Sequence, residues 1–199
     1  MNLTDLGKLH NTDKAKFHNF TDFYEKYFVK KQFLNNNILE IGIGFGGSLR
    51  MLKDYFVKSQ IYGMEIDPKN FINEERISSF YGNQEDEEWL KNNIKNDFYD
   101  IIIDDGGHKM KQQQVSLSVL FKKLKSDGFY ILEDLHTSLE YNENSTLNII
   151  NALRTETNYS SAFFTTEDFN YIKNNVKLID IFIQNHFNTI SITSILIKK

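Results

Sequence analysis

The sequence predicts an α/β protein with an open, mostly parallel sheet of seven strands, an antiparallel hairpin at its C-terminal end and helices on both faces. Two observations lead to this prediction. Short apolar runs alternate with segments of helical period along most of the chain, which is typical of strands and helices that alternate around a parallel sheet. Two strand-like runs joined by the short link 185–188 then close the chain, and they indicate a hairpin.

The individual elements follow from period and composition. Residues 1–19 are polar and have no clear period, so we expect an N-terminal arm. Aromatic residues then recur at intervals of three and four, which predicts an amphipathic helix over residues 20–33 that Asn19 or Thr21 could cap. Gly128 should end the helix that precedes the fifth strand. The predicted strands are residues 38–43, 61–66, 78–82, 99–103, 129–132, 177–184 and 189–198, and the other predicted helices are residues 48–57, 85–95, 112–125 and 146–155.

Glycines follow the first predicted strand and an acid ends the second. Residues 37–47, N-I-L-E-I-G-I-G-F-G-G, contain Gly42, Gly44 and Gly47 in the pattern G-x-G-x-x-G, where glycine permits a positive φ and a close approach of backbone to ligand. Glu65 stands at the spacing of an acid that accepts hydrogen bonds from ribose hydroxyls. The pattern predicts a Rossmann-like site for an adenosine-type cofactor and does not separate NAD from S-adenosylmethionine. A tight strand-to-helix turn without a ligand is the competing interpretation.

Length, composition and charge exclude several classes. A chain of 199 residues, 40% of them hydrophobic, suits one domain, which we expect to comprise an N-terminal arm and helix (1–36) and a Rossmann-like core (37–199). The net charge of −4 and the scattered lysines argue against nucleic-acid binding. No apolar run approaches the roughly 20 residues of a membrane span, so we expect a cytoplasmic protein without membrane contact. The absence of cysteine excludes thiolate metal sites.

Acidic residues and a histidine follow the fourth and fifth predicted strands. Because ligands bind beyond the carboxyl ends of parallel strands, we expect these side chains to converge on one crevice. Neighbouring residues of a strand point to opposite faces, so each strand must end before its pair of acids for both acids to share a ligand. Clustered carboxylates need a cation, and oxygen ligands favour Mg²⁺, with Mn²⁺ or Ca²⁺ as alternatives. A solvated acidic rim is the competing interpretation. The residues concerned are Asp104, Asp105, His108, Glu133 and Asp134.

Five motifs between residues 39 and 138 support a resemblance to a known family. In order they are L-E-I-G-I-G-F-G-G, Y-G-M-E-I-D-P, G-N-Q-E-D, I-I-D-D-G-G-H and L-E-D-L-H-T-S. They resemble class I S-adenosylmethionine-dependent methyltransferases and, more narrowly, the metal-dependent sugar O-methyltransferases of the macrocin and mycinamicin type. The earlier segment N-T-D-K-x-x-x-H-N-F-T-D-F-Y-E-K-Y-F is also similar to that family. Asn83 stands where the resemblance would place an aspartate.

The resemblance implies methyl transfer from S-adenosylmethionine to a hydroxyl of a sugar or another small polar acceptor. It implies Asp105, Glu133 and Asp134 as ligands of Mg²⁺ or Mn²⁺. His108 would be the catalytic general base, because a histidine near a metal-bound hydroxyl suits that role. The residues implied around the cofactor are Glu40, Gly42, Gly44, Glu65, Asn83, Gln84 and Asp104.

The remaining candidates concern the acceptor. Residues 136–145 and 159–169 are polar and aromatic, and they are either an acceptor lid or ordinary surface loops. The expected partner is a small molecule, a sugar or nucleotide-sugar, and the edge hairpin leaves a homo-oligomer open. Further candidate contacts of the substrate or of the cofactor's methionine end are Lys14, His18, Tyr24 and His136.

Two other function classes remain open from the sequence. An NAD-dependent oxidoreductase would share the glycine turn, although little of this chain remains beyond the sheet for a substrate domain. A non-catalytic cofactor-binding protein could share the fold, although the presence of acids and a histidine at the predicted site weighs against it.

Overall fold

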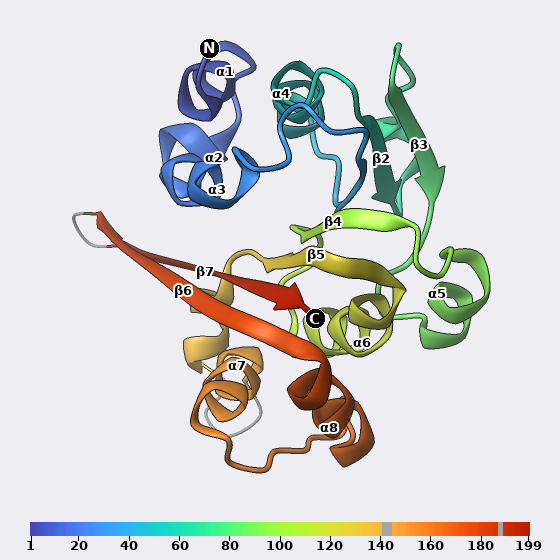
Figure 1. Cartoon of the computed structure of the whole chain (residues 1–199), viewed down its shortest axis with the longest axis vertical. Coiled ribbons are helices and arrows are strands. Elements are labelled where there is room, and N and C mark those ends of the chain that lie inside the picture. The colour runs from blue at the N-terminus through green and yellow to red at the C-terminus, as the bar shows by residue number, and fades with distance from the viewer. Residues whose placement is uncertain (141–144, 187–188) are drawn as a thin grey trace.

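A central sheet of seven strands organises the molecule in the order β3-β2-β1-β4-β5-β7-β6 (Figure 1). This computed structural model describes residues 1–140, 145–186 and 189–199. Strands β1 to β5 are parallel, β7 runs antiparallel to β5, and β6 runs antiparallel to β7. The predicted open, mostly parallel sheet with an antiparallel C-terminal hairpin is therefore confirmed. The strands are β1 (Asn37–Ile41), β2 (Gln60–Glu65), β3 (Ile77–Tyr81), β4 (Tyr99–Asp104), β5 (Leu124–Leu132), β6 (Val176–His186) and β7 (Thr189–Lys198).

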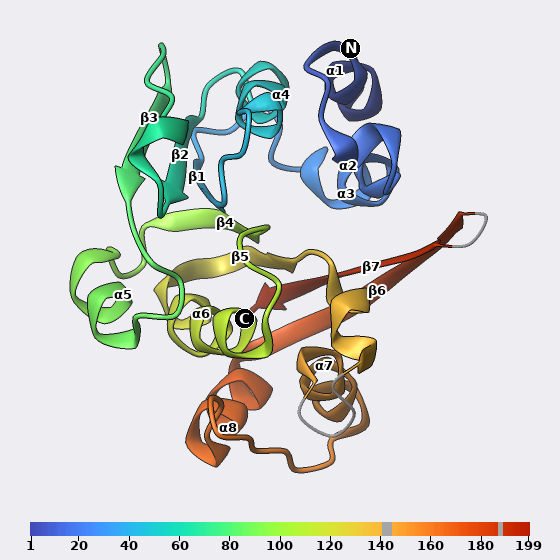
Figure 2. The ribbon, with the colours of Figure 1, turned by 180° about the vertical axis from the view of Figure 1, so that it is seen from behind.

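Helices cover both faces of this sheet. Figure 1 shows α1 to α4 on one side and α5 to α8 on the other, and Figure 2 shows the same two layers from behind. The helices are α1 (Leu3–Leu9), α2 (Asp13–Lys16), α3 (Phe20–Phe28), α4 (Gly47–Tyr55), α5 (Glu87–Asn93), α6 (Met110–Lys123), α7 (Thr146–Thr155) and α8 (Thr166–Asn175), with short 3-10 helices η1 (Pro68–Asn70) and η2 (Leu135–Glu140).

The central strands are buried on both faces and supply two separate cores. In β4, Ile101 and Ile103 pack with the core under α3 and α4, whereas Ile102 packs with the core under α6 and α7. Successive residues of β5 alternate in the same way, with Ile131 on the first side and Leu132 on the second. This alternation follows from the geometry of a strand, in which neighbouring side chains point to opposite faces.

The N-terminal arm differs from its prediction because it folds into α1 and α2. The two helices are only 7 and 4 residues long, too short to show a clear period in the sequence. They pack closely, since a Cβ added to Gly7 would lie 2.5 Å from the Cβ of Ala15. The next helix begins as predicted but ends at Phe28. Asn19 is the N-cap residue, one of the two predicted, but it takes a left-handed conformation and makes no side-chain cap hydrogen bond, and the Thr21 hydroxyl pairs with Thr4 at 2.7 Å.

Two further predictions need correction. Gly128 does not end α6, which stops at Lys123; Leu124 takes an extended conformation and pairs with Tyr99, so Gly128 lies within β5. Residues 159–169 are not a surface loop throughout, because Phe164 and Phe169 are fully buried in the core and α8 begins at residue 166. Of the other lid segment, residues 136–140 belong to η2 and residues 141–144 lie outside the described residues. Strand β5 begins five residues before its predicted start at residue 129, and the remaining predicted elements agree with the structure to within two residues at each end.

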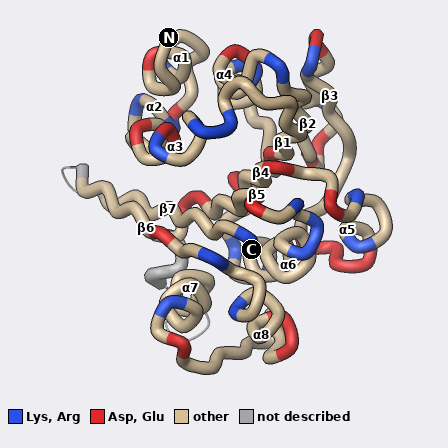
Figure 3. Tube along the Cα trace, in the orientation of Figure 1, with Lys and Arg blue, Asp and Glu red and all other residues tan. Residues whose placement is uncertain are grey.

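Two further features of the described chain are the distribution of its basic residues and the character of its helices. Lys and Arg are dispersed over many elements (Figure 3). None of the helices in the described ranges has the length and apolar character that crossing a membrane requires.

Candidate active site

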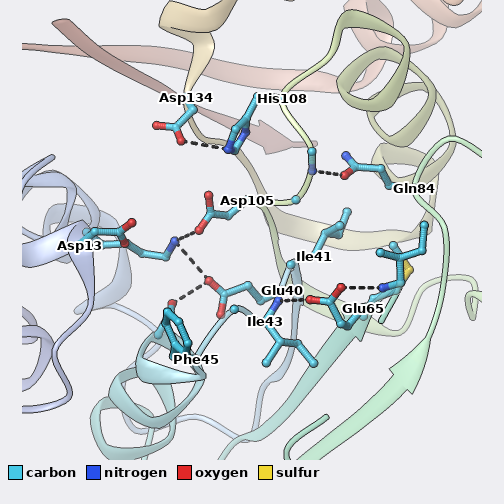
Figure 4. Close-up of a pocket in the computed structure, with 18 of the residues that line it drawn as sticks. Asp13, Glu40, Ile41, Ile43, Phe45, Glu65, Gln84, Asp105, His108 and Asp134 are labelled. Atoms are coloured by element: carbon cyan, nitrogen blue, oxygen red, sulfur yellow. Dashed lines mark hydrogen bonds and ion pairs between the residues drawn. The ribbon is translucent and has the colours of Figure 1, made fainter. Parts of the chain in front are cut away.

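A cavity of about 670 Å³ opens beyond the carboxyl ends of β1, β2 and β4 (Figure 4). Its wall combines the glycine turn after β1, the end of β2, the loops after β3 and β4, and residues 11–14 of the N-terminal segment. This is the edge of a parallel sheet at which ligands bind. The sequence-predicted residues that line it are Lys14, Glu40, Gly42, Gly44, Glu65, Asn83, Gln84, Asp105, His108 and Asp134.

The glycine turn needs each of its three predicted glycines for a different reason. Gly42 has φ +84°, and a side chain there would collide with the backbone carbonyl of Asp105. Gly44 has φ +51°, and a Cβ there would meet no atom within 4 Å, so its backbone is open to a ligand. A Cβ on Gly47 would lie 2.5 Å from the carbonyl oxygen of His10, so this glycine lets the N-terminal segment pack against α4.

Glu65 is held as a charged acceptor at the end of β2. Its Oε2 accepts a hydrogen bond from the Ile43 amide at 3.1 Å, and its Oε1 accepts from the amides of Ile66 at 2.8 Å and Asp67 at 3.1 Å. Partial burial would raise its pKa, but these amide donors outweigh burial and lower it. A carboxylate offers about four acceptor positions, and the three amides occupy three of them, so Oε2 keeps one position for a ribose hydroxyl.

Glu40 presents an unsatisfied oxygen at the same cavity. Its Oε1 accepts a hydrogen bond from the Ser48 hydroxyl at 2.7 Å. Its buried Oε2 has no hydrogen-bond partner among the described residues. Burial raises the pKa of Glu40 to about 7, although the nearby ammonium of Lys14 opposes the shift. A donor on a bound ligand would satisfy this oxygen, because a buried polar atom without a partner is costly.

Asp104 differs from its prediction because it is not among the residues that line the cavity. It is still part of β4, so it points to the face opposite Asp105 and is 2% exposed. It accepts hydrogen bonds from the side chains of Ser116, Tyr130 at 3.1 Å and Gln84 at 3.0 Å. Gln84 in turn accepts from the Gly107 amide at 2.5 Å. Asp104 therefore positions the side chain of Gln84, which does line the cavity.

Asp105, His108 and Asp134 meet at one end of the cavity. One ligand atom from each lies within 4.8 Å of the others, and His108 Nε2 is 3.3 Å from Asp134 Oδ2. Asp134 follows the end of β5 with φ +53°, a left-handed conformation that turns the chain there. Its buried Oδ1 has no hydrogen-bond partner in the part of the chain that the structure describes. Two carboxylates with an unsatisfied oxygen fit a hard divalent cation such as Mg²⁺.

Glu133, the third predicted metal ligand, lies behind this group and is not among the lining residues. Its side chain is 2% exposed, and its Oε2 accepts a hydrogen bond from Lys14 at 2.9 Å. Its Oε1 is buried without a hydrogen-bond partner among the described residues. The Gln113 side chain donates to its backbone carbonyl at 3.1 Å. Glu133 is therefore adjacent to a cation that the chain itself supplies.

That cation is the ammonium of Lys14, which sequence reasoning treated only as a candidate ligand contact. It donates to Asp105 and Glu133 and lies 3.4 Å from Glu40 Oε1. Burial alone would lower the pKa of Lys14, but the three carboxylates outweigh burial and raise it well above its usual value. Part of the positive charge that the acids need is thus built into the fold.

The other candidate contacts lie beside the cavity and not in its lining. His18 Nδ1 is 2.6 Å from the Ser191 hydroxyl and 3.9 Å from Asp134 Oδ1. His136 Nδ1 is 3.8 Å from the same oxygen, and burial, partly offset by Asp134, lowers its pKa. Tyr24 is fully buried, with its hydroxyl 3.2 Å from Thr193. Tyr24 therefore differs from its prediction, because its side chain lies in the core and not in the cavity wall.

Sequence reasoning missed the wall formed by the N-terminal segment. Asn11, Thr12 and Asp13 line the cavity together with Lys14. The available signal was the motif N-T-D-K itself, whose residues 11–14 are the lining residues. Ser48, which orients Glu40, was also missed, although it directly follows the third glycine.

Comparisons with known proteins identify related enzymes. None of the protein-family models compared with the chain matches it. A tetracenomycin rhamnosyl 3'-O-methyltransferase of Streptomyces olivaceus is 37% identical over 146 residues, covering 67% of this chain and 37% of that protein. The mycinamicin VI 2''-O-methyltransferase of Micromonospora griseorubida is 36% identical over 146 residues, covering 68% of this chain and 36% of that protein. The match thus spans little more than a third of the length of these relatives.

Solved structures extend the likeness to the whole chain. The MycE methyltransferase of the mycinamycin biosynthetic pathway, in complex with Mg, S-adenosylhomocysteine (SAH) and mycinamycin VI, superposes with a TM-score of 0.80 at 26% identity. The superposition covers 100% of this chain and 54% of that chain. Fibrillarin of Methanococcus jannaschii, at 15% identity and a TM-score of 0.58, shares the fold alone. The chain is therefore a homologue of the macrocin- and mycinamicin-type sugar O-methyltransferases and has their Rossmann-like methyltransferase fold.

Proposed function

We propose that the chain is an S-adenosylmethionine-dependent O-methyltransferase that acts, with a divalent cation, on a hydroxyl of a sugar or another small polar acceptor. One observation carries the proposal: a single cavity joins the glycine turn and Glu65 to the group Asp105, His108 and Asp134. Homology to sugar O-methyltransferases supports the reaction class. The complex of MycE with Mg and SAH supports the two cofactors.

The cofactor would lie across the glycine turn. The open backbone at Gly44 gives it close approach to the start of α4, and Oε2 of Glu65 would accept a hydrogen bond from a ribose hydroxyl. The unsatisfied Oε2 of Glu40 suits the ammonium group of the methionine part. Asn83 and Gln84, both in the cavity wall, would lie near the adenine, as the family resemblance implies.

The acceptor would meet the other end of the cavity. Asp105 and Asp134 would hold the divalent cation, with Glu133 directly behind them. A cation there lowers the pKa of an acceptor hydroxyl and favours acceptors with neighbouring oxygens, such as a sugar diol. His108, 36% exposed and 3.3 Å from Asp134, would take the hydroxyl proton. The hydroxyl oxygen then bonds to the methyl carbon as the carbon–sulfur bond breaks, which leaves neutral SAH.

Transfer of an isotopically labelled methyl group tests this proposal. The purified chain is incubated with labelled S-adenosylmethionine and panels of free sugars, nucleotide-sugars and glycosylated small molecules, with Mg²⁺ and then with a chelator. We expect label on an acceptor hydroxyl in the presence of Mg²⁺ and loss of transfer after chelation. Transfer that continues at the same rate with the cation removed would contradict the metal-assisted mechanism.

A further inference from the structure

Lys14 connects the ends of three adjacent strands. Its ammonium contacts Glu40 at the end of β1, Asp105 directly after β4 and Glu133 directly after β5. These strands are neighbours in the sheet. Glu40 and Asp105 are labelled in Figure 4, where both face the cavity. One lysine from the N-terminal segment therefore bridges the cofactor end and the proposed metal end of the site.

The segment that carries Lys14 is fixed in place. His10 pairs with Asp54 of α4 at 2.7 Å. The His10 carbonyl packs so closely on α4 that only glycine fits at position 47. Lys14 itself is 1% exposed, and an ammonium is buried to this extent only when carboxylates compensate its lost hydration. The contact is thus part of the fold and differs in kind from a surface lysine that touches an acid.

The charges around Lys14 do not balance. Four carboxyl groups, those of Glu40, Asp105, Glu133 and Asp134, surround the inner end of the cavity beside the ammonium of Lys14. Burial raises the pKa of Glu40 to about 7 and that of Glu133 well above its usual value, although Lys14 opposes both shifts, so one ammonium does not fully stabilise their charged forms. Asp105 belongs both to the carboxylates around Lys14 and to the group that fits a divalent cation. A cation bound there would share Asp105 with Lys14 and be repelled by its positive charge.

We propose that Lys14 is the built-in counter-cation of this acidic cluster. Because it shares Asp105, Lys14 limits the affinity of the neighbouring site for a divalent cation, and this inference rests on the proposed function. Lys14 is in this account a positioning residue, because it acts through the carboxylates that it holds. It keeps Asp105 and Glu133 organised before the divalent cation binds, and it keeps that cation exchangeable.

Titration with Mn²⁺, followed by electron paramagnetic resonance, tests the proposal without any methyl transfer. The variants are Lys14→Met, which removes the charge at similar length, and Lys14→Arg, which keeps it. Lys16→Met is the matched control, because Lys16 is exposed in the same short helix. We expect Lys14→Met to bind Mn²⁺ tighter by about tenfold or more, on the Coulomb energy of charges a few ångström apart. Lys14→Arg and Lys16→Met should stay near the wild type.

A purely structural role for Lys14 would give the opposite result. Loss of packing would leave Mn²⁺ affinity unchanged or weaker in Lys14→Met, and either result overturns the proposal. Binding of SAH by the wild type, measured separately, keeps the two claims apart. A wild type that binds neither Mn²⁺ nor SAH contradicts the proposed function. A wild type that binds both, with Lys14→Met no tighter for Mn²⁺, contradicts only the role of Lys14.

A second measurement uses the wild type and covers the case in which Lys14→Met does not fold. Amine labelling with mass spectrometry compares the labelling rates of Lys14 and Lys16. We expect Lys14 to be strongly protected, and saturating Mn²⁺ to raise its rate relative to Lys16, because linkage makes the competition for Asp105 reciprocal. A Lys14 that reacts as fast as Lys16, or whose rate does not respond to Mn²⁺, contradicts the proposal.

Discussion

At the scale of residues, His108 is the side chain on which the proposed chemistry depends most. It lies in the cavity wall within 3.3 Å of Asp134 and is partly open to solvent, so it can exchange the proton that it accepts. The contact between His108 and Asp134 does not involve the glycine turn, which follows β1, or Glu65, which ends β2. Proton transfer and cofactor binding should therefore be separable by mutation.

Replacement of His108 with alanine should lower kcat by about two to four orders of magnitude, the usual contribution of a general base. The affinity for SAH should stay within about twofold of wild type, because the cofactor end is untouched. Steady-state kinetics with the acceptor found by labelling, together with calorimetry, checks both parts. A His108→Ala variant with near wild-type turnover would rule out His108 as the base.

Glu65 should matter for the cofactor alone. The variant Glu65→Gln removes a charged acceptor and should weaken SAH binding by about tenfold or more, since a hydrogen bond to a charged group contributes roughly 1.5–3 kcal/mol. Binding of Mn²⁺ should not change. Glu74→Gln is the matched control, because Glu74 pairs with Arg50 away from the lined cavity. Equal SAH affinities of the two variants would argue against a ribose contact.

Some residues of the site could be predicted from the sequence, and others could not. Gly42, Gly44 and Glu65 could be found because strand, turn and helix fix their relation within a short stretch. Asp104 and Asp105 could not be separated without knowing where β4 ends, since a strand sends neighbours to opposite faces. The pairing of Lys14 with Asp105 spans 91 positions and depends on how the N-terminal segment packs.

At the scale of elements, α8 was the main omission, although its sequence carries a signal. Thr165 and Asp168 form a capping box, with the Asp168 amide donating to the Thr165 hydroxyl at 3.1 Å. Phe169 and Ile172, three residues apart, supply its buried face. The polar and aromatic composition of this segment concealed a helix of 10 residues.

Asp168 should stabilise α8 in a pH-dependent way. Burial would raise its pKa, but Lys122 at 2.8 Å and the Thr165 donors lower it. Because the folded-state pKa is depressed, its contribution is present above the unfolded-state pKa, about 3.9, and is lost as pH falls through the folded value. Asp168→Ala should lower the free energy of unfolding by about 1–2 kcal/mol at neutral pH, and the difference should shrink in acid.

Urea denaturation at neutral pH and below the unfolded-state pKa measures this effect. Glu167→Ala is the control, since Glu167 is exposed in the same turn. If the free energy of unfolding of Asp168→Ala is lower than that of the wild type by the same amount at both pH values, the stabilisation by Asp168 does not depend on the charge of its carboxylate.

At the scale of the whole molecule, the fold could be predicted from the sequence because β1, β2 and β4 are short, mostly apolar runs and because segments of helical period separate most of the strands. The position of the last strand was not accessible. Strand β7 inserts between β5 and β6, and a hairpin pattern is the same whichever of its strands meets the sheet. The cavity arises at this scale as well, because it needs the segments that follow β1, β2, β3, β4 and β5, together with the N-terminal segment, at one edge of the sheet.

The most direct test of the account is a calorimetric titration of the purified chain with SAH, with NAD as the comparison and Mg²⁺ present. The account predicts saturable binding of SAH and none of NAD. Glu40 is assigned to the ammonium of the methionine part, the open backbone at Gly44 to the close approach of the cofactor, and Glu65 to its ribose. Binding of NAD instead would assign the glycine turn to a dehydrogenase. It would also leave the group Asp105, His108 and Asp134 without its proposed role.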